Sequence, residues 1–404
     1  MESFKPLCHG RYGIVRGPPA EVIEIEKLKK SFPALYFFLI ILLLSQLLYS
    51  CSRKPLAQVP QNCLPEFTDD MNLASLKTAV ETNLEYLRSQ DPQKKIFLAD
   101  RSYSLSTLTQ SQEFFLKLLA GKPTSEELNQ RIRENFDVFQ ATGTSGINLR
   151  RKMIVTGYFQ PVLEGSLKKV EPFIYPLYSV PPDLVQQKIT HTEIKIGRME
   201  GDKLVPYWTR EEIENRHKAA GSEIAWLRDP FDAFVLHVQG SGLIHLRDGS
   251  VRSIHYAAKN GHKYKSIGKY MVASGRIRLE DASMKTIRQY LVVNPQEQDE
   301  ILHYNPSFIF FSWSDTHGAI GNLGKELTAG RSVAVDQSCF PPGALGFLFS
   351  KKPAFPEEKN IQWQPLHRFV VVQDTGSAIR GSGRVDLFWG SGAEAEMQAG
   401  QMKE

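Results

Sequence analysis

Three aspartates near the C-terminus have the residue type and the surroundings that acid–base chemistry needs. They are Asp336 in AVDQS, Asp374 in VVVQDTGSAIRG and Asp386 in GRVDLFWGSG. Each follows an apolar run that predicts a strand, so we expect the carboxyl groups at strand ends, where a rigid frame meets an open cleft. Aromatic neighbours such as Phe388 and Trp389 can desolvate a carboxyl, which raises its pKa and keeps it protonated near neutral pH.

Two other interpretations of these aspartates stay open. An aspartate at a strand end commonly caps a turn, and Asp374 could hold a loop in this way. The run Asp-Thr-Gly-Ser at Asp374 also resembles the signature of aspartic proteases, which need two aspartates that share a proton. The chain has one Asp-Thr-Gly, because the other Asp-Thr pair, Asp315 and Thr316, is followed by His317. An aspartic protease is therefore the weaker alternative.

A second stretch is dense in small residues, amides and tyrosine, which suits a sugar polymer. It runs VQGSGLIHLRDGS over 238–250 and continues as IHYAAKNGHKYKSIG over 254–268. Sugar hydroxyls need directional hydrogen-bond partners, and sugar rings stack on aromatic faces. The residues that we expect to contact a glycan are Gln239, Gly240, Ser241, Gly242 and Tyr256. The alternative is a β-hairpin with glycine turns and no ligand.

Composition limits the classes of protein that fit. The 404 residues are 42% hydrophobic and 23% charged, as in a globular protein of about two domains or of one large domain with an insertion. A net charge of +5, from 49 basic and 44 acidic residues, lacks the excess typical of nucleic-acid-binding proteins. Four cysteines are too few for a disulfide scaffold, and the sequence has no CxxC pair and no HExxH motif. We expect no metal, no cofactor and no nucleic-acid partner.

The first 50 residues have the pattern of an export signal. Residues 27–30 read Lys-Leu-Lys-Lys, and the apolar run ALYFFLIILLL covers 34–44. This run is short for a membrane-spanning helix, which is the alternative, and fits the core of a signal peptide over 1–50. Residues 1–26 are long for a basic leader, as expected of a start placed too far upstream.

The end of this segment resembles a bacterial lipobox. Leu48-Tyr49-Ser50-Cys51 places a small residue before a cysteine, which implies cleavage there and lipidation of Cys51. Residues 51–65 are then an irregular tether between the lipid and the folded part. By the same resemblance, serine rather than aspartate at position 52 implies sorting to the outer membrane.

Periodicity separates a helical part from a β-rich remainder. One apolar stripe has helical spacing: Leu73, Leu76, Val80, Leu84 and Leu87. Thr124 and Glu127 form a capping box that predicts the start of a second helix. From about 150, short β-rich runs such as AFVLHVQGSGLIHL predict a barrel or a sandwich. We expect one helical interruption in this region, over 211–227.

Five ordered motifs resemble one known family. They are GYFQPVLEGS (157–166), HVQGSGLIHLRDGS with YAAKNGHKYKSIG, NPSFIFFSW (305–313), AVDQSCFPPGALGFL (334–348) and QDTGSAIRGSGRVDLFWGSGAEAEMQAGQMK (373–403). Together they resemble the membrane-bound lytic murein transglycosylase A family. The resemblance implies a mainly β fold with an α-helical N-terminal part, in which a second small β-domain is inserted into a double-psi β-barrel.

The same resemblance implies boundaries for these parts. The N-terminal helices and first barrel strands are expected over 66–160, the inserted β-domain over 161–304 and the three-aspartate part of the barrel over 305–404. The sequence departs from the family pattern at Ser377, where a second glycine is usual, and at Gln337 and Cys339 after the first aspartate. These departures concern loop geometry.

The resemblance also implies an activity. Such proteins are periplasmic outer-membrane lipoproteins of Gram-negative bacteria that cleave peptidoglycan strands without water, with cell-wall synthesis or division proteins as candidate partners. The catalytic acid of the family maps to Asp386. Asp374 is expected to tune or orient it, and Asp336 to support the fold. The alternatives are a non-catalytic peptidoglycan-binding lipoprotein and a hydrolase on the same scaffold.

Overall fold

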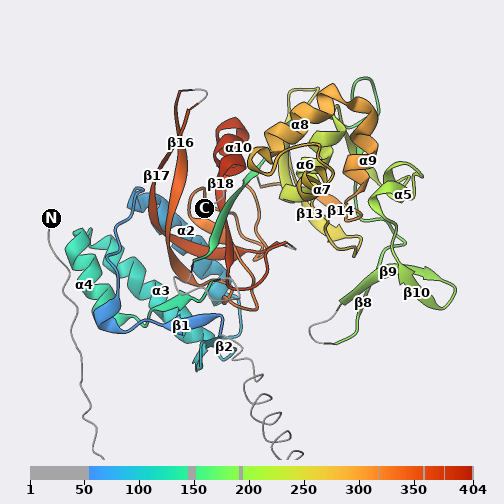
Figure 1. The fold of residues 1–404 in the computed structure, drawn as a ribbon. Coiled ribbons are helices and arrows are strands. Elements are labelled where there is room, and N and C mark those ends of the chain that lie inside the picture. Colours follow the sequence, from blue (N-terminus) through green and yellow to red (C-terminus); the bar gives the residue numbers. More distant parts are fainter. Residues whose placement is uncertain are drawn as a thin grey trace, which may run out of the picture. The chain divides into compact units, whose positions relative to one another are not determined.

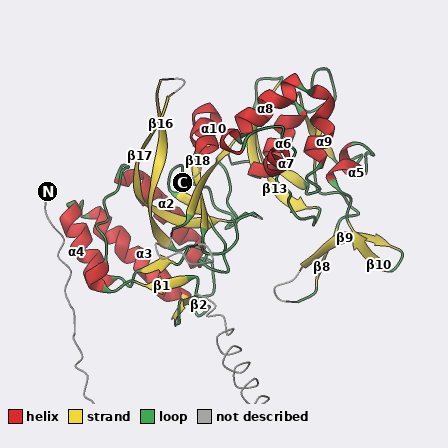
Figure 2. Cartoon of the chain, viewed as in Figure 1, coloured by secondary structure: helices red, strands yellow, loops and turns green. Residues whose placement is uncertain are grey.

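The computed structural model describes residues 54–143, 152–190, 194–316, 318–357, 360–376 and 378–402 (Figure 1). The expected signal peptide, the lipidation site Cys51, His317 and Ser377 lie outside these residues. The described residues belong to one compact unit, Arg53–Glu404. Helices gather in its N-terminal part and in the middle of the chain (Figure 2). In the described part, no helix is both long enough and apolar enough to cross a membrane.

Helices and short strand pairs make up the N-terminal part. β1 pairs with β4 and β2 with β3. In chain order the elements are β1 (Leu56–Gln58), the 3-10 turn η1 (Gln61–Cys63), α2 (Leu73–Arg88), β2 (Lys95–Leu98), β3 (Arg101–Ser104), α3 (Leu105–Ala120), α4 (Ser125–Asn135) and β4 (Phe139–Ala141).

The two helices predicted from the sequence are confirmed. The apolar stripe of α2 is buried from Leu76 to Leu87, and the side chain of Asn72 caps the helix by accepting from the Ser75 N–H. The capping box of Thr124 and Glu127 opens α4, with both of its hydrogen bonds formed. The intervening helix α3 was not predicted.

Strands from both ends of the remaining chain form a five-stranded sheet in the order β16-β17-β15-β18-β5. β18 runs parallel to β5 and antiparallel to β15, while β15 runs parallel to β17. The strand pairings among the described residues make an open sheet with β16 and β5 at its edges. The strands are β5 (Ile154–Gln160), β15 (Ser332–Ala334), β16 (Leu345–Glu357), β17 (Asn360–Asp374) and β18 (Arg384–Ser391), and α10 (Gly392–Gln401) follows β18.

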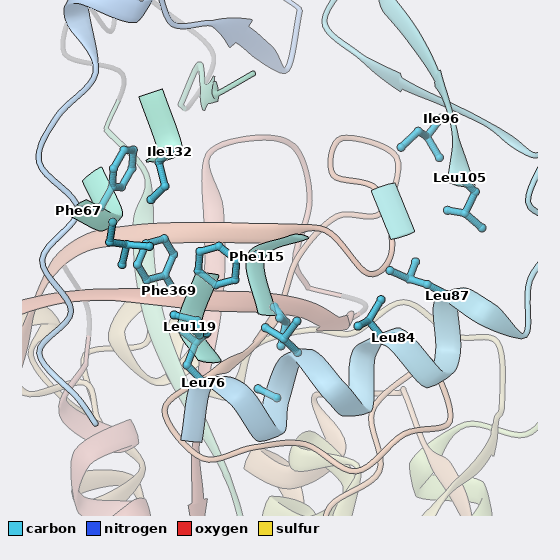
Figure 3. Packing of buried hydrophobic residues seen from close by; sticks show 14 residues of the cluster. Phe67, Leu76, Leu84, Leu87, Ile96, Leu105, Phe115, Leu119, Ile132 and Phe369 are labelled. Atoms are coloured by element: carbon cyan, nitrogen blue, oxygen red, sulfur yellow. The ribbon is translucent and has the colours of Figure 1, made fainter. Parts of the chain in front are cut away.

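The N-terminal helices and this sheet share one hydrophobic core. Leu84 of α2, Phe115 and Leu119 of α3 and Phe369 of β17 are buried together (Figure 3). The rings of Phe115 and Phe369 lie 5.1 Å apart between centroids. Because each buried aliphatic or aromatic side chain contributes about 1.5–3 kcal/mol, this shared core makes the helices an integral part of the sheet domain.

Between β5 and β15 the chain forms a second sheet, of six strands, in the order β14-β13-β12-β6-β11-β7. Its strands are β6 (Val162–Ser166), β7 (Tyr175–Tyr178), β11 (Glu223–Leu227), β12 (Ser241–Leu246), β13 (Val251–Lys259) and β14 (Ile309–Ser314). A separate three-stranded meander contains β8 (Val185–Lys188), β9 (Ile194–Glu200) and β10 (Lys203–Pro206). Since β14 pairs with β13, this sheet extends past the boundary expected at 304.

The inserted part holds more helix than the small β-domain expected from the sequence. Its helices are α5 (Arg210–Glu214), α6 (Pro230–Gln239), α7 (Ile267–Ala273), α8 (Met284–Val293) and α9 (Gln298–His303), with the 3-10 turns η2 (Leu279–Asp281) and η3 (Pro295–Glu297). The helix predicted over 211–227 is wrong beyond α5, because β11 occupies the end of that range.

Helix α6 lies where the sequence pattern predicts a strand, and its ends explain the difference. The Asp229 side chain accepts a hydrogen bond from the Phe231 N–H, and Pro230 occupies the first turn. Gly240 ends the helix in the left-handed conformation, with φ of 83°. An N-cap, a proline at the start and a glycine at the end outweigh the β-propensity of the apolar residues between them.

A buried ion pair fastens the segment before α2 to the five-stranded sheet. The guanidinium of Arg331 is fully buried and donates to both carboxylate oxygens of Asp69, at 2.6 and 2.8 Å. It also donates to the carbonyl oxygens of Phe369 and Asn72. Asp69 in turn accepts from the Phe369 N–H at 2.9 Å. Loss of either charge would leave the other buried without a counter-ion.

We expect Asp69→Asn to lower the free energy of unfolding by about 3–5 kcal/mol, because it leaves the Arg331 charge unpaired in the core. Urea denaturation followed by circular dichroism measures this. The matched control is Glu81→Gln, which breaks an exposed ion pair with Lys77 on α2 and should have no measurable effect. Equal small effects of both substitutions would show that the buried pair contributes little.

Candidate active site

Two of the three aspartates lie near each other because β17 and β18 pair with the two sides of β15. Asp374 ends β17 and Asp386 lies near the start of β18, and both pair in register with Ala334 of β15. Residues in register point their side chains to the same face of a sheet. The small side chain of Ala334 therefore stands between the two carboxyl groups. The sequence predicts Asp386 at the end of a strand, but it lies near the start of β18. It stands beside the ends of β15 and β17.

Both carboxylate oxygens of Asp386 are held by residues of β18 and β5. Arg384 forms an ion pair with it, with Nε 3.0 Å from Oδ1 and Nη2 3.3 Å from Oδ2. The hydroxyl of Thr156, its register partner on β5, donates to Oδ1. The Asp386 side chain is 14% exposed. Fork-like contact with one guanidinium fixes the direction in which the carboxylate points.

Of the two aromatic neighbours that the sequence indicates for Asp386, one shares its face of the sheet and the other does not. Side chains alternate along a strand, so Phe388 shares the face of Asp386 whereas Trp389 lies on the opposite face. The Phe388 ring contacts that of Tyr158, with centroids 5.3 Å apart. Trp389 packs into the core and its indole N–H donates to the sulfur of Met402 at 3.3 Å. Trp389 therefore cannot desolvate the Asp386 carboxyl.

Asp374 has the perturbed carboxyl. Burial raises its pKa to about 6 and the nearby charge of Asp386 adds to this rise, although three hydrogen bonds act in the opposite direction. The donors are the backbone N–H groups of Thr375 and Asn322, each at 2.9 Å, and the hydroxyl of Tyr158 at 3.0 Å. Asp374 thus titrates near neutral pH.

Thr156, Asp386, Ala334 and Asp374 pair in register across four strands and form one cross-strand row. The two carboxyl groups in this row have different environments. Asp386 is ion-paired, and Asp374 is desolvated and hydrogen-bonded to Tyr158. Neighbouring carboxyl groups whose environments separate their protonation are a pattern found in acid–base catalysis. Asp374 thus has the desolvated carboxyl with a raised pKa, a property that the sequence did not indicate for this residue.

Asp336 lies outside this row, in the turn after β15. It accepts from the N–H and the hydroxyl of Ser338, at 3.0 and 2.7 Å, and from the N–H of Gly381 at 2.7 Å. Burial alone would raise its pKa, but the hydrogen bonds from Gly381 and Ser338 hold the pKa below its usual value. Asp336 thereby joins this turn to the segment that leads into β18.

Strand β5 supplies polar side chains that the sequence analysis did not single out. Thr156, Tyr158 and Gln160 alternate along it, and the first two donate to Asp386 and Asp374, respectively. Burial and the Asp374 carboxylate raise the pKa of Tyr158 well above its usual range, so its hydroxyl keeps its proton. The signal for this arrangement was the two-residue period of polar side chains in TGYFQ.

The expected glycan residues 239–242 mainly shape the backbone between α6 and β12. The side-chain oxygen of Gln239 accepts from the Phe159 N–H at 3.1 Å, which ties α6 to β5. Gly240 has the positive φ that ends α6. A Cβ at Gly242 would lie 2.6 Å from Leu236, so the chain has no room for a side chain there.

The other two expected glycan residues differ in exposure. Ser241 is buried in β12. The side chain of Tyr256, on the neighbouring strand β13, is 50% exposed, so it is available to a ligand. Of the five residues predicted for glycan contact, Tyr256 has the geometry that fits this role.

Among the residues that the structure describes, no group of three His, Cys, Asp or Glu side chains could hold a metal ion, and Cys63 and Cys339 are free thiols. The protease alternative would use the second Asp-Thr pair as the partner of Asp374. Asp315 of the second Asp-Thr pair follows β14 and belongs to the other sheet. Asp374 instead has Tyr158 as its side-chain partner.

The fold and the site define a class of protein. It has neighbouring carboxyl groups suited to acid–base chemistry on a mixed sheet, and a second sheet is inserted between the strands of the first. Two family models match these same parts of the chain. Residues 154–312 match the MltA specific insert domain, and residues 331–404 match the 3D domain. The chain belongs to the membrane-bound lytic murein transglycosylase A family.

Relatives and solved structures agree with this assignment. The chain is 27% identical to membrane-bound lytic murein transglycosylase A of Vibrio cholerae over 368 residues, which cover 88% of this chain and 89% of that protein. A crystal structure of membrane-bound lytic murein transglycosylase from Agrobacterium tumefaciens matches with a TM-score of 0.70 and 30% identity, covering 86% of this chain and 94% of that one. Escherichia coli MltA with bound chitohexaose matches with a TM-score of 0.65 and 25% identity, covering 87% and 92%.

The raised pKa of Asp374 predicts how its replacement changes stability with pH. Between its ordinary value of 3.8 and about 6, the folded protein keeps a proton that the unfolded chain releases, so the wild type loses stability as the pH rises through this window. An asparagine at this position cannot titrate. We therefore expect the stability of Asp374→Asn relative to wild type to rise by about 2–3 kcal/mol from pH 4 to pH 7.

Urea unfolding at four pH values between 4 and 7 measures this difference. Asp336→Asn is the matched control: the pKa of Asp336 is lowered, so its contribution to stability is lost only as the pH falls below about 4, and the difference from wild type should hardly vary between pH 4 and 7. A difference between Asp374→Asn and wild type that does not vary with pH would show that Asp374 is not desolvated.

Proposed function

We propose that this protein is a peptidoglycan lytic transglycosylase that cleaves the β-1,4 bond between N-acetylmuramic acid and N-acetylglucosamine and leaves 1,6-anhydromuramyl ends. The observation that carries the proposal is the cross-strand row of Thr156, Asp386, Ala334 and Asp374. Membership of a family whose relatives are named lytic murein transglycosylases supports the same activity.

Asp386 is the proposed acid and then base. Its proton goes to the glycosidic oxygen as the bond to the anomeric carbon breaks, through a state with oxocarbenium character. The resulting carboxylate then takes the proton of the muramyl C6 hydroxyl, whose oxygen attacks the anomeric carbon of its own sugar. An intramolecular nucleophile needs no activated water, and its proximity can replace a second catalytic carboxylate.

Asp374 and Asp336 have supporting parts in this proposal. Asp374 and Tyr158 are positioning residues: their charge and hydrogen bond set the electrostatic environment of Asp386 across Ala334. Asp336 holds the segment before β18, so it fixes where that strand begins. Neither role requires contact with the sugar.

The proposed substrate is the glycan strand of peptidoglycan. Tyr256 offers an exposed aromatic face, while residues 239–242 shape the turn beside β5. The related Escherichia coli protein has been crystallised with chitohexaose, a sugar oligomer, which supports a glycan-binding role for the fold.

We also propose the setting in which this activity takes place. Export through the signal over 1–50, lipidation at Cys51 and a tether over 51–65 would anchor the protein to the outer membrane and face it toward the periplasm. The five-stranded sheet is the proposed core of a double-psi barrel, into which the six-stranded sheet is inserted. Cell-wall synthesis and division proteins are the proposed partners.

We expect Asp386→Asn to lose glycan cleavage by at least about a hundredfold, because an amide can neither donate nor accept the proton. The assay is digestion of purified peptidoglycan by the chain from Ser52 onward, read by mass spectrometry. Asp315→Asn, at an exposed position after β14, is the matched control and should cleave as the wild type does. Thermal unfolding of each variant checks that it is folded.

The products separate the alternatives. The proposal is supported if the wild type and Asp315→Asn release anhydro-muropeptides and Asp386→Asn does not. Hydrated reducing ends would identify a hydrolase on the same scaffold. Anhydro products from Asp386→Asn would remove that residue from its role. Binding to sacculi without cleavage by the wild type would indicate a wall-binding lipoprotein.

A further inference from the structure

The ion pair between Arg384 and Asp386 opposes the role of Asp386 as an acid. A general acid must carry a proton before it can donate one. In the structure both oxygens of Asp386 face the Arg384 guanidinium, at 3.0 and 3.3 Å, and such a contact favours the charged form of a carboxyl over its protonated form. If Asp386 is the acid of the proposed function, on which this inference rests, the contact must open during the reaction.

Arg384 has the exposure and the spare donors to leave this contact. Its side chain is 35% exposed, whereas the structural Arg331 is fully buried and bonded to two carboxylate oxygens and two carbonyls. Its remaining contacts are long: Nη1 lies 3.3 Å from the Ala378 carbonyl oxygen and Nη2 3.4 Å from the Thr156 hydroxyl. A guanidinium has five donor hydrogens, so Arg384 can take a further acceptor.

Arg384 has neighbours on its own sheet and an electrostatic effect beyond it. Asp386 and Thr156 contact it from β18 and β5, and its charge acts on Tyr264 in the loop before α7. Burial raises the pKa of Tyr264, while the positive charges of Arg210 and Arg384 act to lower it, so Arg384 acts on a residue of the inserted part. A ligand that contacts Asp386 would therefore also lie within reach of the Arg384 guanidinium.

We propose that Arg384 is a specificity-determining residue, which binds the acyl oxygen of the lactyl group at C3 of the muramyl unit. This oxygen belongs to a carboxylate or to an amide carbonyl, and both are strong acceptors for a guanidinium. N-acetylglucosamine carries only a hydroxyl at C3. The muramyl group draws Arg384 away from Asp386 and leaves that carboxylate free to take up a proton from solvent. Only a sugar with the acyl group at C3 therefore releases Asp386 from Arg384, so that Asp386 can become protonated and act as the acid.

The test compares two soluble glycans on the full chain from Ser52 onward. One is a peptide-free oligomer of alternating N-acetylglucosamine and N-acetylmuramic acid, for which KM and kcat of anhydro-product formation are measured. The other is chitohexaose, for which the inhibition constant against the first glycan is measured. The variants are Arg384→Gln and Arg384→Lys. Arg380→Gln is the control, since it removes an exposed arginine four residues upstream.

We expect Arg384→Gln to raise KM for the muramyl glycan about tenfold or more, because it loses a charge-assisted hydrogen bond. The inhibition constant of chitohexaose should change less than about twofold in every variant. Arg384→Lys should have a KM between those of Arg384→Gln and the wild type, because lysine keeps the positive charge but cannot donate two parallel hydrogen bonds as a guanidinium does. Arg380→Gln should behave as the wild type.

Other outcomes would overturn the inference. A fall in kcat at unchanged KM would mean that Arg384 only orients Asp386. If the KM of the muramyl glycan and the inhibition constant of chitohexaose rose by the same factor, Arg384 would shape the site without recognising the group at C3. If the wild type forms no anhydro ends, the proposed function fails, and Arg384 is then tested by calorimetric affinities for the two glycans: equal loss on Arg384→Gln, or no loss, would overturn its role as well.

Discussion

The pairing of β5 with β18 is the constraint on which the candidate site depends. It brings Thr156 beside Asp386, although 230 positions separate the two residues, and it aligns both with the end of β17 through β15. Parallel neighbours need a long crossover connection, and here that crossover contains the six-stranded sheet and β15 to β17. Because the entropic cost of closing a loop grows slowly with its length, a large insertion is compatible with this pairing.

The same pairing accounts for the difference between the two carboxyl groups. Asp386 lies on the strand that also carries Arg384, so its counter-ion is two residues away on the same face. Asp374 lies at the end of β17, beneath Tyr158 and against the backbone of Asn322, where it is desolvated. Ala334 pairs in register with both and so lies between them. Local sequence thus supplies the counter-ion of Asp386, whereas strand order supplies the buried surroundings of Asp374.

The sequence predicted those features that depend on local pattern. The stripe of α2 and the capping box of α4 are fixed by spacing and by cap chemistry, and the apolar runs before Asp336 and Asp374 are strands. Helix α6 was missed because its apolar residues suit a strand and only its ends indicate a helix. The desolvation of Asp374 was missed because burial is a tertiary property. Neither the direction of Trp389 nor the contact of Tyr158 with Asp374 follows from neighbours in sequence.

The position of β18 in the chain has a consequence for biosynthesis. β5 and the inserted sheet precede it, so they leave the ribosome before Arg384 and Asp386 have been made. A chain that ends before β18 lacks Asp386. It also lacks the strand that lies between β15 and β5. The candidate site therefore cannot form until the last strand of the sheet has been made.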